Sequence, residues 1–143
     1  MSKTRTASAR WSGSLRDGNG ILTAPSGAFT NLAYDFGRRF EDEPGTNPEE
    51  LIAAAHAGCF SMAFSAALGA SGFTPETIET EAAVTLDLSG DLPTITKSDL
   101  TMKAKIPGIS QEDFQRIADG AKGGCPVSRL LTAEITLKAE LVG

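Results

Sequence analysis

The sequence contains few of the side chains that metal sites and catalytic triads use, with one histidine and two cysteines among 143 residues. A zinc site would need carboxylates to complete it, because His56, Cys59 and Cys125 alone supply too few ligands. A Ser-His-Asp triad is not supported either, since the single histidine lies inside an apolar helical stretch. No glycine-rich segment follows a strand and opens a helix, as nucleotide binding would require. We therefore expect no metal and no other cofactor.

Positive charge is also scarce in this chain. Thirteen Lys and Arg against eighteen Asp and Glu leave a formal net charge of −5. Nucleic-acid binding needs clustered basic residues, so a nucleic-acid partner is not expected. The first ten residues are polar and no apolar segment follows them, which predicts a cytoplasmic protein without a secretory signal. Because that compartment keeps thiols reduced, free, catalytic or redox-active cysteines are favoured over a structural disulfide.

The longest apolar stretch, residues 51–68, predicts the core helix of the fold. Asn47 can cap its first turn, Pro48 suits the first helical position, and Glu50 has the spacing of a capping box. The residues that follow are almost all small or apolar, which predicts a helix buried on nearly all sides. We expect it to end at the glycines of residues 69–72. Its richness in Ala and Gly, with no second candidate, argues against a membrane partner.

The segment before this helix predicts a three-stranded β-meander. Its strands are expected at residues 10–15, 21–24 and 29–40, separated by turns that are rich in Gly, Asn, Asp and Pro. Residues 1–9 show no periodicity and are expected to be disordered.

The segment after the helix predicts alternating strands and helices. The expected elements are antiparallel strands at residues 78–88 and 94–106, a helix at 111–122, a short helix at 126–131 and a strand at 133–141. Ser110 can cap the first of these two helices. Since no repeat or linker interrupts the chain, a single α+β domain over residues 1–143 is expected.

The two cysteines occupy different predicted environments. Cys59 lies in the middle of the apolar helix, where a thiol is either an inert packed side chain or needs a nearby cation to react. Cys125 directly precedes Pro126 and can be the N-cap of a short helix, where the helix dipole lowers the pKa of a thiol. Position alone therefore favours Cys125 as the more acidic thiol.

A cation for Cys59 could come from Arg38 or Arg39, although either arginine could equally be a solvated surface charge. Glu49 or Glu50 could hold a guanidinium, or could serve only at the helix N-terminus. Glu49 precedes Cys59 by ten residues, so about 15 Å of helix rise separates them. One arginine cannot easily bridge that distance within a chain. We therefore expect a homodimer in which the long helices pack antiparallel and Arg and Glu act across the interface.

His56 lies three residues before Cys59 and so projects near it on a helix. It could act as a base or as a charge partner. We favour a hydrogen-bonded core or interface histidine, because a lone histidine in an apolar helix usually has that role.

Several motifs occur together along the chain. They include Arg39-Phe40-Glu41, Gly45-Thr46-Asn47-Pro48-Glu49-Glu50-Leu51-Ile52, Ala54-Ala55-His56-Ala57, Cys59-Phe60-Ser61-Met62-Ala63, Gly72-Phe73-Thr74-Pro75 and Gly124-Cys125-Pro126-Val127-Ser128. With these motifs the chain resembles the osmotically inducible protein C (OsmC) family, from Trp11 to the C-terminus. The related organic hydroperoxide resistance proteins share the cysteine pair, but His56 and the Glu49-Glu50 pair resemble the OsmC branch.

The resemblance implies an α+β fold with antiparallel sheets packed around long central helices, in an intertwined homodimer. It implies a thiol-dependent peroxidase that reduces organic hydroperoxides, and more weakly hydrogen peroxide, in oxidative and osmotic stress defence. By this likeness Cys59 is the peroxidatic thiol and Cys125 the resolving thiol, while Arg39 holds the thiolate and Glu49 orients Arg39. The implied reductant is an external dithiol or a lipoylated protein. A non-catalytic stress-induced protein that binds a hydrophobic ligand, or a redox sensor, remain the alternative hypotheses.

Overall fold

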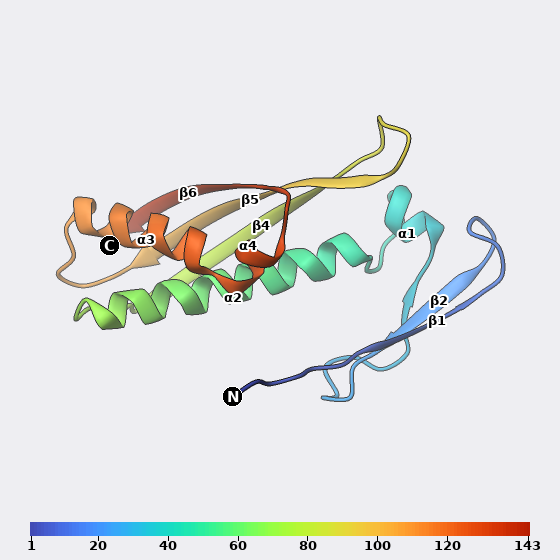
Figure 1. Ribbon diagram of the computed structural model, residues 1–143, viewed down its shortest axis with the longest axis horizontal. Helices are drawn as coiled ribbons and strands as arrows, with labels where there is room; N and C mark the ends of the chain where they lie inside the picture. The colour runs from blue at the N-terminus through green and yellow to red at the C-terminus, as the bar shows by residue number, and fades with distance from the viewer. The chain divides into compact units, whose positions relative to one another are not determined.

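The computed structural model covers residues 1–143 and contains two three-stranded sheets and four helices (Figure 1). This confirms the predicted α+β class. The chain divides into two compact units, Met1–Leu51 and Ile52–Gly143, which are described separately below. That the whole chain forms one domain stays a prediction.

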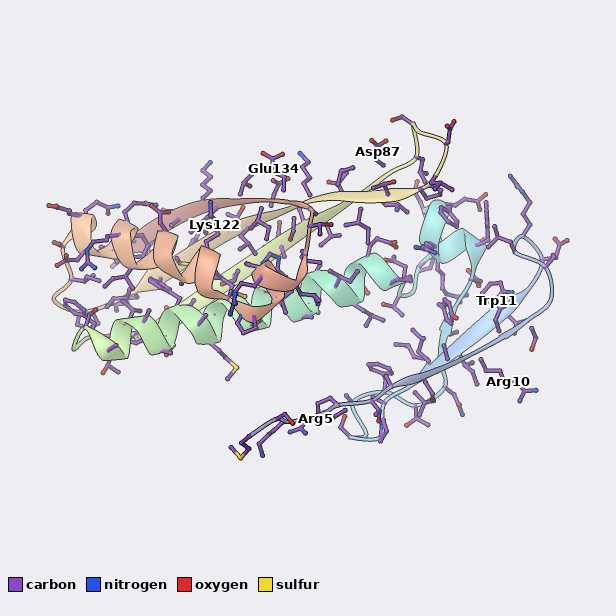
Figure 2. The ribbon with its side chains drawn as sticks, viewed as in Figure 1. Arg5, Arg10, Trp11, Asp87, Lys122 and Glu134 are labelled. Carbon is purple, nitrogen blue, oxygen red and sulfur yellow. The ribbon has the colours of Figure 1, made fainter.

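The first unit begins with the predicted antiparallel meander. Its strands are β1 (Ser8–Ser12), β2 (Asn19–Thr23) and β3 (Leu32–Tyr34), in the order β1-β2-β3. The predicted disorder of residues 1–9 is wrong for Ser8 and Ala9, because both pair with β2. Trp11 of β1 (Figure 2) and Tyr34 of β3 both pair with Gly20 between them, and their rings meet with centroids 5.5 Å apart. The missing side chain at Gly20 makes room for this contact.

A short helix, α1 (Phe36–Phe40), follows β3. The prediction of an extended segment through residue 40 is therefore wrong. Asp35 starts the helix as its N-cap, since its carboxylate accepts the Arg38 backbone N–H at 2.9 Å. The Asn47 side-chain amide also donates to the Arg38 carbonyl at 3.1 Å. Five residues are too few to display a helical period, which explains why the sequence pattern did not reveal α1.

The long helix α2 (Pro48–Ala70) begins as predicted. Asn47 accepts the Glu50 backbone N–H on its side-chain oxygen at 2.8 Å, and Pro48 is the first helical residue. The predicted capping box is not closed, because the Glu50 carboxylate instead accepts the Thr46 hydroxyl at 2.8 Å. A local side-chain partner thus replaces the backbone N–H that a capping box would bind.

The end of α2 also follows the prediction. The Phe73 N–H donates to the Leu68 carbonyl at 2.9 Å and the Gly72 N–H donates to the Gly69 carbonyl at 3.1 Å. Together these bonds form a Schellman motif, which needs a left-handed residue at the position of Gly72. Gly72 adopts that conformation, with φ of +85°.

Only one stripe of α2 is buried, so the prediction of a helix buried on nearly all sides is wrong for this chain. After Glu49 in the first turn, the buried residues recur every fourth position, as His56, Phe60, Phe64 and Leu68. The exposed face consists mainly of small residues, namely Ala54, Ala55, Gly58, Ser65, Ala66, Gly69 and Ala70, together with Met62 at 77% exposure. α2 is also the one helix whose length and apolar composition would suffice to cross a membrane. This is weak evidence, because core helices of soluble proteins have the same properties.

The second unit contains a mixed sheet, formed by β4 (Thr77–Asp87), β5 (Thr94–Lys105) and β6 (Glu134–Val142). β4 and β5 pair antiparallel as predicted, whereas β5 and β6 pair parallel. The expectation of purely antiparallel sheets is therefore wrong. The two helices α3 (Gln111–Gly124) and α4 (Pro126–Leu130) form a crossover that returns the chain to the same end of the sheet. Figure 2 labels Lys122 near the end of α3 and Glu134 at the start of β6, which precede and follow α4 in the chain.

Helix α3 carries the cap and the apolar stripe that the sequence predicts. Ser110 accepts the Asp113 backbone N–H at 3.1 Å, and Phe114, Ile117 and Ala121 are buried. The helix continues through the two glycines at positions 123 and 124, two residues beyond the predicted end. α2 and α3 run along the sheet in Figure 1, and their buried side chains share one core with the inward residues Leu100, Met102 and Ala104 of β5.

We expect Phe64→Ala to lower the free energy of unfolding by about 3 to 5 kcal/mol, because it removes a fully buried aromatic ring. Phe64 packs against Phe60 and Phe114, with ring centroids 6.0 and 5.8 Å away. Urea titration followed by circular dichroism measures the change. Leu92→Ala is the control, since Leu92 is 76% exposed and should change stability by no more than about 0.5 kcal/mol. Equal effects of the two substitutions would contradict the assignment of the core.

Candidate active site

The structure brings the two cysteines into contact within the second unit. Cys59 lies on α2 and is partly buried, whereas Cys125 is the N-cap of α4 and is fully buried. Both are free thiols, and their side chains interact with one another. The crossover between β5 and β6 thus places a residue far away in sequence beside the middle of α2.

The environment of Cys59 opposes ionisation of its thiol. Burial raises the pKa of Cys59, and the contact with Cys125 raises it further. The Val127 backbone N–H acts in the opposite direction but does not compensate. No cation is among the groups that shift this pKa. The second unit alone therefore disfavours the Cys59 thiolate.

Cys125 has the opposite tendency. Burial alone would raise the pKa of the Cys125 thiol, but the Ser128 backbone N–H, the Cys59 thiol, the Ser128 hydroxyl and the Val127 N–H together lower it below its ordinary value. The Cys125 side chain makes no capping hydrogen bond at the start of α4. The N–H groups of Val127 and Ser128 and the Ser128 hydroxyl are donors that would stabilise a Cys125 thiolate. The prediction that position favours Cys125 as the more acidic thiol is confirmed.

His56 is a fully buried histidine between two serine hydroxyls. Its Nδ1 lies 2.7 Å from the Ser98 Oγ, and its Nε2 lies 2.8 Å from the Ser128 Oγ. Burial lowers the pKa of His56, which favours the neutral ring. The favoured interpretation, a hydrogen-bonded core histidine, is confirmed.

Sequence reasoning missed both serines, although each carries a signal. Ser98 is a polar residue at an inward position of the alternating strand β5, where a core side chain is expected. Ser128 lies three residues after the N-cap residue Cys125, which is the spacing at which side chains reach back toward an N-cap.

Arg39 and Glu49 form an ion pair within the first unit. Arg39 Nη2 donates to Glu49 Oε1 at 2.8 Å, and Arg39 Nε lies 3.2 and 3.3 Å from the two carboxylate oxygens. The Glu49 side chain is 10% exposed and the Arg39 side chain 35%, so the carboxylate is shielded from water while the guanidinium is partly exposed. The neighbouring Arg38 pairs instead with the Asp35 carboxylate and donates to the Pro44 carbonyl at 3.1 Å. The two adjacent arginines therefore have separate carboxylate partners.

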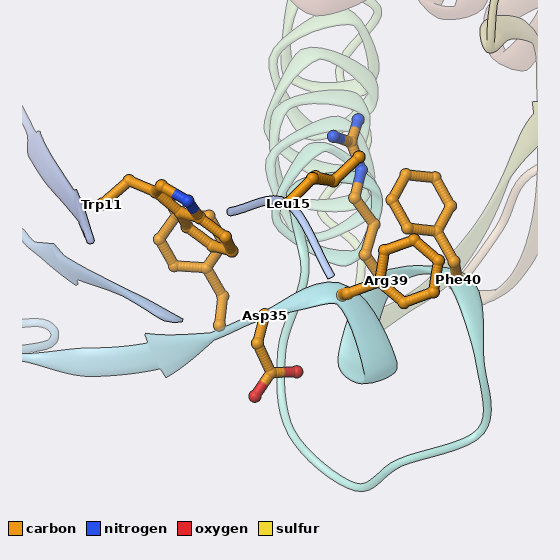
Figure 3. Close-up of a pocket in the computed structure, with 7 residues that line it drawn as sticks. Trp11, Leu15, Asp35, Arg39 and Phe40 are labelled. Atoms are coloured by element: carbon orange, nitrogen blue, oxygen red, sulfur yellow. The ribbon is translucent and has the colours of Figure 1, made fainter. Parts of the chain in front are cut away.

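An apolar pocket of about 310 Å³ surrounds Arg39 in the first unit. Its lining residues come from β1, the turn that follows it, β3 and α1, and are Trp11, Leu15, Tyr34, Asp35, Phe36, Arg39 and Phe40. Figure 3 shows Trp11 and Phe40 on opposite sides, with Leu15 and Arg39 between them and the Asp35 carboxylate directed away. The Arg39 guanidinium also lies 5.2 Å from the centre of the Phe40 ring. The aromatic wall of this pocket was not predicted from the sequence.

The four predicted site residues thus form two pairs, one in each unit. Arg39 and Glu49 form an ion pair in the first unit, and Cys59 and Cys125 are in contact in the second. No group of three or more His, Cys, Asp and Glu side chains is arranged to hold a metal ion. The second unit offers two thiols with backbone donors, and the first unit offers a guanidinium held by a carboxylate.

Comparison with known families gives a match of residues 40–140 to the family model described as OsmC-like protein. The chain belongs to the OsmC-like family. It is 48% identical over 141 residues to peroxiredoxin OsmC of Escherichia coli (strain K12), which covers 99% of each chain. The organic hydroperoxide resistance protein OhrA of Bacillus subtilis is a more distant relative, 31% identical over 99 residues and 69% of each chain.

Solved structures show the same OsmC-like fold. The OsmC-like protein of Mycoplasma pneumoniae superimposes with a TM-score of 0.77 at 15% identity, over 100% of both chains. The organic hydroperoxide resistance protein OhrB of Bacillus subtilis gives a TM-score of 0.63 at 24% identity, over 96% of this chain and 98% of the other. At such identities the likeness concerns the fold alone.

Proposed function

We propose that this protein is a thiol-dependent peroxidase that reduces organic hydroperoxides and, more weakly, hydrogen peroxide. The observation that carries the proposal is the contact between two free cysteines, one on α2 and one at the start of α4. Two such thiols can together supply the two electrons that reduce a peroxide, because their oxidation gives one disulfide. The names of the relatives, peroxiredoxin OsmC and organic hydroperoxide resistance protein, agree with this chemistry.

In the proposed cycle the Cys59 thiolate attacks the O–O bond and releases an alcohol, or water from hydrogen peroxide. The Cys59 sulfenic acid then condenses with Cys125 to a disulfide. An external dithiol or a lipoylated protein reduces the disulfide by thiol exchange. Turnover of this kind would serve oxidative and osmotic stress defence in the cytoplasm.

The cycle requires a cation at Cys59, because burial raises the pKa of that thiol. We assign this role to Arg39, which Glu49 holds in a forked ion pair. A guanidinium both favours a thiolate and polarises the departing oxygen. If Arg39 lies at Cys59, the apolar pocket that Arg39 lines would lie beside the reacting thiol. The apolar lining of this pocket suits the alkyl group of an organic hydroperoxide.

We further propose that Arg39 acts across a homodimer. Glu49 and Cys59 are ten residues apart on α2, which is about 15 Å of helix rise. An antiparallel pair of α2 helices would bring the start of one helix toward the middle of the other. The exposed small-residue face of α2 supports this arrangement, because small side chains permit close helix packing.

The proposal is tested by following the consumption of cumene hydroperoxide by the purified protein with dithiothreitol as electron donor. We expect sustained turnover, together with a Cys59–Cys125 disulfide detected by mass spectrometry after the donor is withheld. A single stoichiometric reaction without turnover would favour a redox sensor. No reaction at all would favour a binding protein that uses the pocket around Arg39 for a small hydrophobic ligand.

Cys125→Ser is expected to leave the first chemical step intact and to block disulfide formation. The variant should react once with cumene hydroperoxide and then accumulate a Cys59 sulfenic acid, which dimedone traps as an adduct. The wild-type protein, treated identically, should give mostly disulfide and little adduct. An absence of the adduct in Cys125→Ser, with peroxide still consumed, would contradict the role of Cys125 as the resolving thiol.

A further inference from the structure

A buried hydrogen-bonded chain leads from β5 through α2 to the first turn of α4, which Cys125 begins. Ser98 of β5 bonds His56 Nδ1, and His56 Nε2 bonds the Ser128 hydroxyl of α4. Ser128 follows the N-cap residue Cys125 by three residues in the first turn of α4, and its hydroxyl is among the groups that lower the pKa of the Cys125 thiol. Exposure is zero for His56, Ser98 and Cys125 and 8% for Ser128, so water does not compete for these contacts.

The hydrogens along this chain are coupled because a neutral imidazole carries one N–H and one lone pair. If Nε2 holds the proton, His56 donates to Ser128, whose own hydrogen is then free to point at the Cys125 sulfur. If Nδ1 holds the proton, Ser128 must donate to His56, and its lone pair faces Cys125 instead. The first arrangement suits a Cys125 thiolate and the second suits a neutral Cys125 thiol.

We propose that His56 is a positioning residue for Cys125: by donating from Nε2 to Ser128, it directs the Ser128 hydroxyl hydrogen at the Cys125 thiolate during disulfide formation. This inference rests on the proposed peroxidase function and adds a residue that acts after peroxide has reacted. The motif around Cys59 contains His56 three residues earlier, yet the hydrogen bonds of His56 lead to the other thiol.

The step that His56 serves is the condensation of the two sulfurs. The Cys125 thiolate attacks the Cys59 sulfur, an S–S bond forms and the S–O bond of the sulfenic acid breaks. Hydroxide leaves and takes up the proton that the Cys125 thiol has lost, which gives water. The Cys125 sulfur is oxidised and the Cys59 sulfur is reduced, with the peroxide of the preceding step as the oxidant.

Within the second unit, no charged side chain offers a competing explanation for the reactivity of Cys125. Cys59 on α2 is the one titratable group that acts on it, and its other polar neighbours are Ser128 and Val127 of α4. From β5 the group against His56 is the neutral Ser98. The adjacent charged residues Lys97 and Asp99 pair with each other on the opposite face of β5.

Two substitutions of His56 separate a positioning role from a purely structural one. In His56→Gln the amide can replace Nε2 and retain the bond to Ser128, whereas in His56→Asn the shorter amide can replace Nδ1 and retain only the bond to Ser98. Each variant loses one buried hydrogen bond, so similar losses of stability are expected. Only His56→Asn loses the donor to Ser128.

The test is a single turnover with one equivalent of cumene hydroperoxide, quenched with dimedone and resolved by mass spectrometry. We expect His56→Asn to slow disulfide formation about tenfold, the factor that one charge-assisted hydrogen bond can supply. The rate of sulfenic acid formation should not change, so the dimedone adduct accumulates. His56→Gln should remain within about threefold of the wild-type rate. Equal rates of disulfide formation in the two variants would overturn the proposal.

A second pair of variants keeps the test decisive if the His56 substitutions do not fold. Ser128→Ala removes the hydroxyl that reaches Cys125 and should also slow disulfide formation. Ser61→Ala is the matched control, because it removes a different hydroxyl contact of α2, 2.7 Å from Ser61 to Thr80 of β4. If Ser128→Ala and Ser61→Ala form the disulfide at the same rate, the inference is wrong.

A peroxide-independent measurement distinguishes failure of this inference from failure of the proposed function. In the Cys59→Ser background Cys125 is the remaining thiol, so the thiolate absorbance as a function of pH reports the ionisation of Cys125 without a reagent that must reach a buried sulfur. His56→Asn should shift that profile to higher pH and His56→Gln should not. A shift in a protein that reduces no peroxide would uphold the chain from His56 to Cys125 while refuting the peroxidase. An unshifted profile in an active peroxidase would refute only the role of His56.

Discussion

Cys59→Ser is expected to abolish peroxidase turnover, with a loss of at least roughly a thousandfold in kcat/KM. A serine hydroxyl at this position cannot form a sulfenic acid, and its pKa lies far above that of a thiol. The remaining thiol, Cys125, is fully buried and has no guanidinium among the groups that act on it. Consumption of cumene hydroperoxide with dithiothreitol measures the loss.

The serine variant changes one atom in a partly buried position, so an unfolded protein is not the expected cause of inactivity. Unchanged circular dichroism and an unchanged urea midpoint provide the control. Ser61→Ala, two residues further along α2, should retain wild-type turnover. Full activity of Cys59→Ser would contradict the assignment of the peroxidatic thiol and would leave Cys125 as the reacting residue.

Arg39→Ala is expected to lower kcat/KM for cumene hydroperoxide by about a hundredfold to a thousandfold. The substitution removes the cation that we propose for the Cys59 thiolate, and burial otherwise keeps the pKa of that thiol raised. In the proposed cycle it also removes the donor to the leaving oxygen. The thiolate absorbance of Cys125→Ser, with and without Arg39→Ala, measures the ionisation of Cys59 alone and should show a shift to higher pH.

The adjacent arginine provides a matched control. Arg38 is on the same short helix but pairs with the Asp35 carboxylate rather than with Glu49. Arg38→Ala should therefore reduce kcat/KM by no more than about threefold. A larger loss in Arg38→Ala than in Arg39→Ala would show that the wrong arginine has been assigned to the thiol.

Mixing two inactive variants tests whether Arg39 acts across the dimer. A chain with Arg39→Ala keeps Cys59, and a chain with Cys59→Ser keeps Arg39. Coexpressed chains should recover about a quarter of the wild-type activity if a site combines Arg39 of one chain with Cys59 of the other, because half of the dimers then contain one complete site. No recovery would place both residues of a site in the same chain.

Elements with strong local signals were predicted well from the sequence. The start of α2 follows from Asn47 and Pro48, and its end follows from Gly72, because caps depend on residues within one turn of the helix. The alternating pattern located β4 and β5 for a similar reason. It could not reveal that β6 runs parallel to β5, since alternation encodes which face of a strand is buried and not its direction.

The polar contacts of the candidate site were harder to foresee because they join distant residues. His56 bonds Ser98 and Ser128, which are 42 and 72 residues away in the chain. Residue spacing in the sequence cannot predict hydrogen-bond partners this far apart before the fold is known. The pairing of Arg39 with Glu49, rather than Glu50, was implied by family resemblance and not by the residues alone, because both glutamates have the same local chemistry.

The crossover that carries Cys125 has a consequence for the oxidised protein. A bond from Cys125 to Cys59 would fasten the connection between β5 and β6 to the middle of α2 and close a large loop in the unfolded chain. Because the disulfide would lower the conformational entropy of the unfolded chain, oxidation would stabilise the folded chain by about 4 kcal/mol. Exposure to peroxide would then make the spent enzyme more resistant to heat and proteases, so that it persists until a reductant restores its thiols.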